Sequence, residues 1–320
     1  MKILVADDDA NSRQLLHQTL KSAGYEITEV ADGESALSIL NNEGGPRIAL
    51  LDWIMPGMDG TEVCQAVRSR RDQPYVYLIL LSQKQGKSDV VAGLESGADD
   101  YLAKPFHPEE LHARLRTGQR ILKLQDKLVD AREQMWFKAT HDGLTSLWNR
   151  GFVLDLLERE LARARRESSS LALLMCDLDH FKEVNDRRGH LAGDEVLREI
   201  ARRLLGSVRV YDTVGRYGGE EFIIILHGCD GLRGRNRAEQ IRRIVEKKPV
   251  TTGRGTVSIT ISIGVVSSRD YPGMTVEQLL HEGDAALYRA KAEGRNRVIL
   301  VPPENAAAPL EIEMERTRQD

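Results

Sequence analysis

The sequence predicts a two-domain α/β protein with an N-terminal five-stranded parallel sheet, a helical connector and a C-terminal α+β sheet. In the first third, short apolar strands alternate with helical stretches, which is typical of a doubly wound, flavodoxin-like sheet. The stretch from Pro108 to Lys138 has no internal proline, as expected of a long helix. The last part places helices between strands around a glycine turn, which favours a palm-like α+β sheet.

The composition limits the class of protein. The 320-residue length fits two domains, and a net charge of −4 argues against wholesale binding to nucleic acid or to an anionic membrane. No apolar run approaches the roughly 20 residues of a membrane span, and the N-terminus reaches acidic residues too early for a signal peptide. The scattered cysteines Cys64, Cys176 and Cys229 fit reduced thiols in the cytoplasm better than disulfides or a zinc site.

The N-terminal sheet is expected to place polar residues at the carboxyl ends of its strands. The expected strands are Lys2–Ala6, Tyr25–Ala31, Arg47–Leu51, Leu78–Leu81 and Tyr101–Ala103. The expected helices are Asn11–Ala23 and Ser35–Asn41. Sites in doubly wound sheets form at the carboxyl ends of strands. In this chain those ends carry Asp7, Asp8, Asp52, Ser82 and Lys104.

The acidic strand ends predict a site that accepts a phosphoryl group. Carboxylates gathered in one pocket repel each other unless a divalent cation or an ammonium group offsets their charge. With a metal and Lys104 nearby, Asp52 is suited to act as a nucleophile toward phosphorus. The alternative is that these acids cap helices. Capping fits Asp9 but fits Asp52 poorly, because the stretch Trp53–Pro56 does not begin a helix.

The connector carries an apolar seam of about two heptads. The seam residues are Ile121, Leu124, Leu128, Ala131 and Met135, with charged residues on both flanks. One interpretation is a single amphipathic helix that lies on one domain. We expect instead a helix continuous with the last helix of the first domain and paired, as a coiled coil, with the same helix of a second copy.

The C-terminal domain is expected to begin after a helix-breaking stretch at Asp142–Arg150. The expected strands are Leu171–Cys176, Asp212–Tyr217, Phe222–Leu226, Val257–Val266 and an edge strand at Arg297–Val301. The expected helices are one that starts near Phe152, then Glu195–Leu205, an arginine-rich helix that ends near Lys247, and Val276–Glu293.

A tight turn with two acids lies between two of these strands. Gly218 and Gly219 suit a hairpin turn because glycine tolerates positive φ, but the repelling acids Glu220 and Glu221 serve no purpose in a hairpin alone. Since Asp177 ends a neighbouring strand, we expect Asp177 and Glu220 to face each other as in a two-metal phosphoryl-transfer site. The alternative is a solvated hairpin with an acidic flank.

Other residues of this domain suit a purine nucleoside triphosphate. Lys182, Lys291 and Arg295 are spaced to bind phosphates. Asn185 and Asp194 suit a purine edge, since a carboxylate accepts hydrogen bonds from the N1–H and N2–H groups that guanine has and adenine lacks. Taken singly, each has a structural alternative, such as a helix N-cap at Asp194 or a solvated helix end at Lys291.

The strand ends of the N-terminal domain carry a family resemblance. The matching pieces are Asp7-Asp8, Leu51–Gly60, Ser82 and Lys104–Phe106. They resemble a response-regulator receiver domain. The resemblance implies Mg²⁺ bound by Asp7, Asp8 and Asp52, and phosphorylation of Asp52 by an upstream histidine kinase of a two-component system. It also implies that Ser82 and Lys104 contact the phosphoryl group and that Tyr101 is the aromatic switch, for which a half-buried strand tyrosine is the alternative.

A second resemblance covers residues from about 140 to 302. The matching motifs are Asp142–Thr145, Asp177–Asp186, Gly189–Asp194, Gly218–Phe222 and Ala290–Asn296. They resemble the GGDEF-type diguanylate cyclase domain, a nucleotidyl cyclase, in its GGEEF variant. The resemblance implies condensation of two GTP into cyclic di-GMP and two pyrophosphates, by two domains that face each other in a homodimer.

The cyclase resemblance also implies residue roles. Asp177, the Leu178 carbonyl and Glu220 bind Mg²⁺, with Mn²⁺ as an alternative. Glu221 is a candidate metal ligand or general base. The implied substrate-binding residues are Gly218 and Gly219 at the turn, Asn185 and Asp194 for guanine, and Lys182, Lys291 and Arg295 for the phosphates.

Arg209 and Asp212 precede the turn at the RxxD spacing of the family's product-inhibition site. The alternative is a surface ion pair, and Gln240 stands where a second arginine is expected, which leaves the strength of inhibition open. The alternative functions are a non-catalytic cyclic di-GMP receptor and a cyclase that makes a mixed cyclic dinucleotide. The intact glycine–acid turn disfavours the first, and Asp194 disfavours the second.

These inferences divide the chain into four expected parts. They are a receiver domain at 1–120, a helical coiled-coil linker at 121–140, a cyclase domain at 141–302 and a tail at 303–320.

Overall fold

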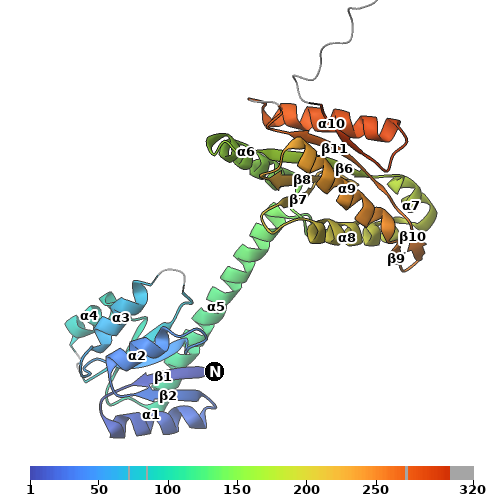
Figure 1. Cartoon of the computed structure of the whole chain (residues 1–320). Helices are drawn as coiled ribbons and strands as arrows, with labels where there is room; N and C mark the ends of the chain where they lie inside the picture. The colour runs from blue at the N-terminus through green and yellow to red at the C-terminus, as the bar shows by residue number, and fades with distance from the viewer. Residues whose placement is uncertain (71–72, 84–85, 271–272, 303–320) are drawn as a thin grey trace, which may run out of the picture. The chain divides into compact units, whose positions relative to one another are not determined.

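The computed structural model describes residues 1–70, 73–83, 86–270 and 273–302, and the predicted tail lies outside these residues. The chain forms two compact units, an N-terminal unit at Met1–Glu133 and a C-terminal unit at Gln134–Asp320. Both have the predicted class of fold: a five-stranded parallel sheet in the first, and a mixed α/β sheet in the second (Figure 1).

The N-terminal unit is a doubly wound sheet with the strand order β2-β1-β3-β4-β5, all parallel. Its strands are β1 Lys2–Ala6, β2 Glu26–Val30, β3 Ile48–Asp52, β4 Tyr77–Ser82 and β5 Asp100–Ala103. Its helices are α1 Ala10–Ser22, α2 Gly33–Leu40, α3 Gly60–Arg68, α4 Lys87–Glu95 and the start of α5 Pro108–Thr140. Because the strands are parallel, the ends of β1, β3, β4 and β5 lie along one edge.

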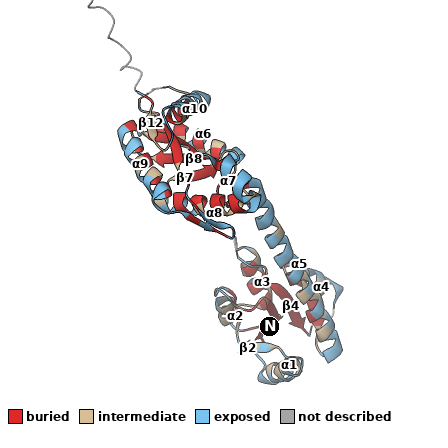
Figure 2. Cartoon of the chain, turned by 90° about the vertical axis from the view of Figure 1, so that its right-hand side faces the viewer, coloured by how far each residue is buried: buried red, intermediate tan, exposed pale blue. Residues whose placement is uncertain are grey.

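Apolar residues on the two faces of this sheet form two separate cores. One core joins the sheet to α1 and α5 through residues such as Leu16, Leu111 and Leu115. The other joins it to α2 and α3 through residues such as Ala36 and Val63. Figure 2 shows the central strands in the colour of buried residues. This packing on both faces is why the strands are near-continuous apolar runs in the sequence.

Helix α5 continues past the N-terminal unit and ends in the C-terminal unit. Leu122 is 5% exposed and belongs to the N-terminal core, whereas the seam residues Leu124, Leu128 and Met135 are 58%, 66% and 70% exposed. The predicted connector helix is therefore present in this chain. Its pairing with a second copy stays a prediction.

The C-terminal unit has a five-stranded sheet with the order β12-β11-β6-β8-β7. The strands are β6 Leu171–Leu178, β7 Thr213–Arg216, β8 Glu221–His227, β11 Ile261–Ser267 and β12 Val298–Leu300. The helices after α5 are α6 Arg150–Arg166, α7 Phe181–Arg188, α8 His190–Ser207, α9 Gly231–Lys247 and α10 Val276–Ala292. Helices α8 and α9 cover one face of the sheet, and α6 and α10 cover the other (Figure 1).

The predicted strand Val257–Val266 was wrong as a single element. The structure divides it into β10 Gly255–Val257, which pairs with β9 Val250–Thr252 in a small separate sheet, and β11, which lies in the main sheet. Between them, the Thr260 hydroxyl donates to the Asp179 carboxylate and the Thr260 carbonyl accepts from the Asp179 backbone N–H. Contacts with Asp179 thus take the place of a continuous strand at this point.

Among the residues that the structure describes, no helix combines the length and the apolar character that a membrane span requires.

Helix α10 packs unusually close to β11 at Gly264. We predict that Gly264→Ala lowers the free energy of unfolding by about 1 to 3 kcal/mol, the usual cost of overpacking. An added Cβ would lie 2.3 Å from the Gly283 carbonyl oxygen and 2.5 Å from the Leu287 nitrogen, and backbone atoms cannot rotate away. Urea unfolding of the full chain measures the change.

The matched control is Gly206→Ala in α8, where no heavy atom lies within 4 Å of the added Cβ. It should be neutral or slightly stabilising, since alanine favours helix over glycine. If both variants unfold at the same urea concentration, the close approach at Gly264 is not the constraint described here.

Candidate functional site

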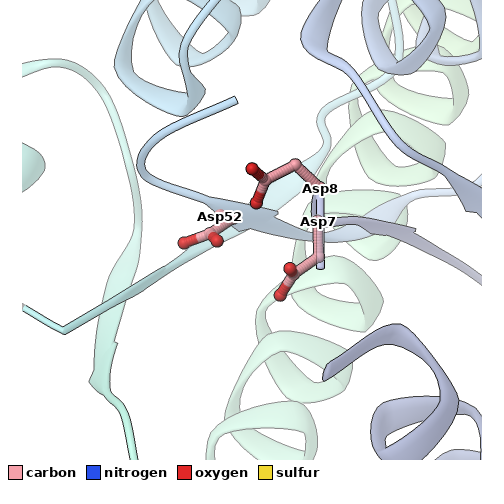
Figure 3. Close-up of side chains that lie close together, drawn as sticks. All are labelled: Asp7, Asp8 and Asp52. Carbon is pink, nitrogen blue, oxygen red and sulfur yellow. The ribbon is translucent and has the colours of Figure 1, made fainter. Parts of the chain in front are cut away.

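Three carboxylates meet at the carboxyl edge of the N-terminal sheet. Asp7 and Asp8 follow β1, and Asp52 is the last residue of β3. Each offers a carboxylate oxygen, and these oxygens lie within 4.8 Å of one another (Figure 3). Among the described residues, this is the one group of three or more acid, histidine or cysteine side chains gathered so closely.

Lys104, just after β5, neutralises part of this cluster. Its Nζ lies 2.6 Å from Asp7 Oδ2 and 3.0 Å from Asp52 Oδ2. The side chain of Asp7 is fully buried and that of Asp52 is 16% exposed. Burial raises the pKa of Asp52, while the Lys104 ammonium works against that rise and the Asp7 charge adds to it. The cluster therefore has more negative charge than one lysine offsets.

The neighbouring acid Asp9 has a different role. Its carboxylate accepts hydrogen bonds from the backbone N–H groups of Asn11 and Ser12, so Asp9 is the N-cap of α1. Helix capping, the alternative role for these acids, is thus the role of Asp9. Asp52 caps no helix: its carboxylate accepts from the Trp53 N–H and from Lys104.

Two further predicted residues lie near the same edge. Ser82 is 2% exposed at the end of β4, and its carbonyl accepts from the Lys104 N–H at 2.7 Å. Tyr101 in β5 is 7% exposed and meets the Trp53 ring edge-on, with 6.2 Å between ring centroids. Tyr101 is thus more buried than a half-buried strand tyrosine, which is the alternative to the aromatic switch.

The residues at this edge fit a divalent cation. Hard carboxylate oxygens are the ligands that Mg²⁺ prefers, and a cation would offset the charge that Lys104 leaves uncompensated. Asp7, Asp8 and Asp52 are the side chains that would hold it.

A second set of acids lies at one end of the C-terminal sheet. Asp177 is within β6, one residue further into the strand than predicted, and pairs in register with Glu221 of β8. Directly opposed residues of antiparallel strands share a face, so these two side chains point toward the side covered by α6 and α10. The predicted partner, Glu220, precedes β8, and its carbonyl accepts from the Leu178 N–H at 3.2 Å.

The glycine turn is held by Arg216. Its guanidinium donates to the carbonyls of Gly218 and Gly219 and forms an ion pair with Asp142 at 3.0 Å. Gly218 also leaves room for the acid after the turn, because an added Cβ there would lie 2.4 Å from Glu221 Oε2. Sequence reasoning took Asp142 only as part of a motif. The available signal was Arg216, a cation two residues before the glycine turn that needs an acidic partner.

Burial and mutual repulsion raise the pKa values of these acids. Burial is the largest cause at Asp177, where the Lys291 ammonium at 2.8 Å works in the opposite direction. Burial and then the charge of Asp177 raise the pKa of Glu220 and of Glu221. This donor set fits a divalent cation as well, since a second positive charge would relieve the repulsion.

The structure brings some of the predicted nucleotide-binding residues together. Lys291, at the end of α10, contacts Asp177, and the charge of Arg295 also works against the rise in the pKa of that acid. Asn185 of α7 lies against α8, because a Cβ added at Gly193 would lie 1.9 Å from its Oδ1. Asp194 follows Gly193 in α8. Lys182 is exposed in the first turn of α7, and the structure gives it no contact with the acids.

The loop at Arg209–Asp212 exposes its arginine and buries its acid. The Asp212 side chain is 2% exposed and accepts hydrogen bonds from the backbone N–H groups of Arg209 and His227. Arg209 is exposed and donates to the Tyr211 hydroxyl. Asp212 therefore shapes the loop, and Arg209 is the group available to a ligand.

Sequence reasoning missed the role of Asp179, which is 4% exposed and accepts three hydrogen bonds. The available signal was its position two residues after Asp177. A second acid at the end of a buried strand needs hydrogen-bond donors from elsewhere in the chain.

Comparisons with known proteins match both units. Residues 139–297 match the family "Diguanylate cyclase, GGDEF domain", and residues 3–116 match the family "Response regulator receiver domain". The response regulator PleD of Caulobacter vibrioides is 34% identical over 303 residues, which cover 93% of this chain and 65% of PleD. Diguanylate cyclase DosC of Escherichia coli is 42% identical over 160 residues, which cover 50% of this chain and 34% of DosC. The chain thus spans less than two thirds of these relatives.

A solved structure agrees with the match to the GGDEF domain. The coiled coil and GGDEF domain of DgcB from Caulobacter crescentus, in complex with c-di-GMP, is 32% identical with a TM-score of 0.53. The match covers 60% of this chain and 99% of that chain.

The acid cluster of the N-terminal unit gives a test of cation binding. We predict that Mg²⁺ stabilises the N-terminal unit by about 1 to 3 kcal/mol when it exceeds its dissociation constant ten- to hundred-fold. Asp8→Asn removes one of the three ligands and should abolish most of this effect. Thermal unfolding of the full chain, with MgCl₂ or with EDTA, measures it.

Asp9→Asn is the control, because it changes a neighbouring acid that only caps α1, and asparagine caps helices equally well. A Mg²⁺ response that survives in Asp8→Asn, or that disappears in Asp9→Asn, would contradict the assignment.

Proposed function

Because the chain belongs to the diguanylate cyclases with a GGDEF domain, here preceded by a response-regulator receiver domain, we propose that it condenses two GTP into cyclic di-GMP and two pyrophosphates. The observation that supports this most directly is the set of acids around the turn. Asp177 and Glu221 oppose each other in adjacent strands, Glu220 adjoins them, and Lys291 contacts Asp177.

In the proposed reaction, the 3′-hydroxyl oxygen of one GTP attacks the α-phosphorus of the other, and the bond from that phosphorus to the bridging oxygen of pyrophosphate breaks. The 3′-hydroxyl oxygen of the second nucleotide then attacks the α-phosphorus of the first in the same way. This step releases the second pyrophosphate and closes the ring. Each hydroxyl loses its proton, and Glu221 is the candidate base, since burial and the charge of Asp177 raise its pKa. One C-terminal unit holds one GTP in this proposal, so two copies must face each other.

Each remaining residue of the site has a proposed task. Lys182, Lys291 and Arg295 bind the triphosphate, and the carboxylate of Asp194 with the amide of Asn185 recognises guanine. Asp177, Glu220 and the Leu178 carbonyl would hold Mg²⁺, with Mn²⁺ as an alternative. When bound, the metal supplies positive charge at the oxygens on which negative charge develops.

We propose that the N-terminal unit regulates this reaction through phosphorylation of Asp52 by an upstream histidine kinase. An Asp52 oxygen attacks the phosphorus, and the bond from phosphorus to the kinase histidine breaks. Lys104 is already 3.0 Å from the Asp52 carboxylate, so its charge is in place for the added phosphoryl oxygens. Ser82 and Tyr101 are the proposed switch residues, and exposed seam residues of α5 are the proposed dimer contact.

Product inhibition is the last part of the proposal. Arg209 suits bidentate contact with guanine O6 and N7, and the buried Asp212 holds the backbone of Arg209 in place.

The reaction and its control can be tested together. We predict that the full chain with Mg²⁺ and GTP forms cyclic di-GMP, and that beryllofluoride, a mimic of the phosphoryl group, raises the rate. Asp52→Asn should lose the response to the mimic. Asp177→Asn should lower the rate about a hundred-fold or more in both conditions, because it removes charge from the reacting centre.

Asp155→Asn, an exposed acid of α6, is the matched control and should behave as wild type. Chromatography of products from a GTP and ATP mixture identifies the base. A mixed dinucleotide would overturn the guanine assignment, and absence of any cyclic dinucleotide would overturn the proposed reaction in favour of a binding role.

Arg209→Ala tests the inhibition separately. We predict an inhibition constant for cyclic di-GMP that is about ten-fold higher, since a bidentate arginine–guanine pair is worth about 1 to 3 kcal/mol. The initial rate without product should not change. Arg166→Ala, an exposed arginine near the end of α6, is the control. Unchanged inhibition in Arg209→Ala would remove this loop from the proposal.

A further inference from the structure

Asp179 is a buried acid that holds three segments of the C-terminal unit together. One carboxylate oxygen accepts from the Ser262 hydroxyl at 2.7 Å. The other accepts from the Thr260 hydroxyl at 2.7 Å and from the Asn296 backbone N–H at 3.0 Å. Both donors of the second oxygen are distant in sequence, 81 and 117 residues away. The carboxylate thus ties the end of β6 to the loop after α10.

That loop has an unusual backbone. Gly294, Arg295 and Asn296 have φ values of +115°, +61° and +46°. Residues other than glycine rarely adopt positive φ, and they keep it only where the surroundings impose it. At Asn296 the surroundings are specific: Asp179 holds the N–H, Arg242 donates to the side-chain oxygen, and Glu246 accepts from the side-chain nitrogen.

The direction of Arg295 depends on this backbone. Its side chain is exposed and makes no hydrogen bond or ion pair with another side chain in the part of the chain that the structure describes. Its direction therefore follows from its φ and from the anchor at the next residue. The backbone N–H of Arg295 donates to the carbonyl of Ala290, the residue before Lys291, at 3.0 Å. Lys291, one turn earlier, contacts Asp177 directly. The two cations therefore approach the acids from the same short segment.

We propose that Asp179 is a positioning residue for substrate: it holds the Asn296 N–H, keeps the loop in its left-handed conformation, and so presents Arg295 to the triphosphate beside Asp177. This inference rests on the proposed binding of GTP. It assigns Asp179 no contact with nucleotide and no part in binding guanine.

Binding measurements on the full chain separate this role from simple support of the fold. The probes are GMP and a GTP analogue with a methylene group between the α and β phosphorus atoms, which cannot release pyrophosphate. Asp179→Ala should weaken binding of the analogue about ten-fold. This is the usual effect of losing one hydrogen bond between charged groups, here the bond from Arg295 to a phosphate. Binding of GMP, which lacks the β- and γ-phosphates, should change less than two-fold.

Two further variants serve as controls. Asp179→Asn should bind the analogue as wild type does, because its oxygen can accept from Asn296 and Thr260 while its amide donates to Ser262. Ser262→Ala removes one bond to Asp179 but leaves the bond to Asn296, so it should also keep its affinity.

A double-mutant cycle tests whether Asp179 acts through Arg295. If it does, Asp179→Ala should weaken binding of the analogue less than two-fold when Arg295→Ala is already present. If Asp179→Ala does not fold, Asn296→Val and Asn296→Gly replace it. Valine resists positive φ and should lose affinity for the analogue, whereas glycine accepts positive φ and should keep it.

Equal losses for GMP and for the analogue, additive losses in the cycle, or unchanged binding in Asp179→Ala would each overturn the inference. Failure of wild type to bind the analogue would instead overturn the proposed function, so the two failures are distinct.

Discussion

Repulsion between carboxylates, offset by one lysine in each unit, is the constraint on which both sites depend. Lys104 lies between Asp7 and Asp52, and Lys291 contacts Asp177. Each lysine comes from a segment far along the chain from the acid that it meets, so the acids can gather only when the sheet has formed. The remaining negative charge is left for a cation. The same repulsion between carboxylates thus opposes folding and favours the binding of a cation.

The sequence allowed much of this arrangement to be predicted, because strand ends are easy to recognise. An apolar run that stops at Asp7 or Asp52 places that acid at the edge of a sheet, whatever the details of packing. The short helices were harder. Helix α3 begins at Gly60 behind a capping box of Asp59 and Glu62, a signal that Pro56 and Gly57 just before it obscured. Helix α7 buries only Phe181 and has little apolar periodicity.

What could not be predicted depends on contacts between distant residues. Nothing near Asp179 in the sequence shows that its partners are Thr260, Ser262 and Asn296. The break between β10 and β11 follows from the same contacts, since local propensity favoured one long strand. The register that opposes Asp177 to Glu221, with Glu220 next to the pair, likewise depends on strand pairing that a pattern of apolar residues does not fix to one residue.

The clamp of Arg216 on the glycine turn has a consequence for the entropy of binding. Two consecutive glycines form the most flexible segment that a chain can offer, and ordering them at the moment of binding would weaken affinity. Here the guanidinium engages both glycine carbonyls and is itself fixed by Asp142. The turn is therefore ordered during folding, and a nucleotide meets a surface whose shape is already set.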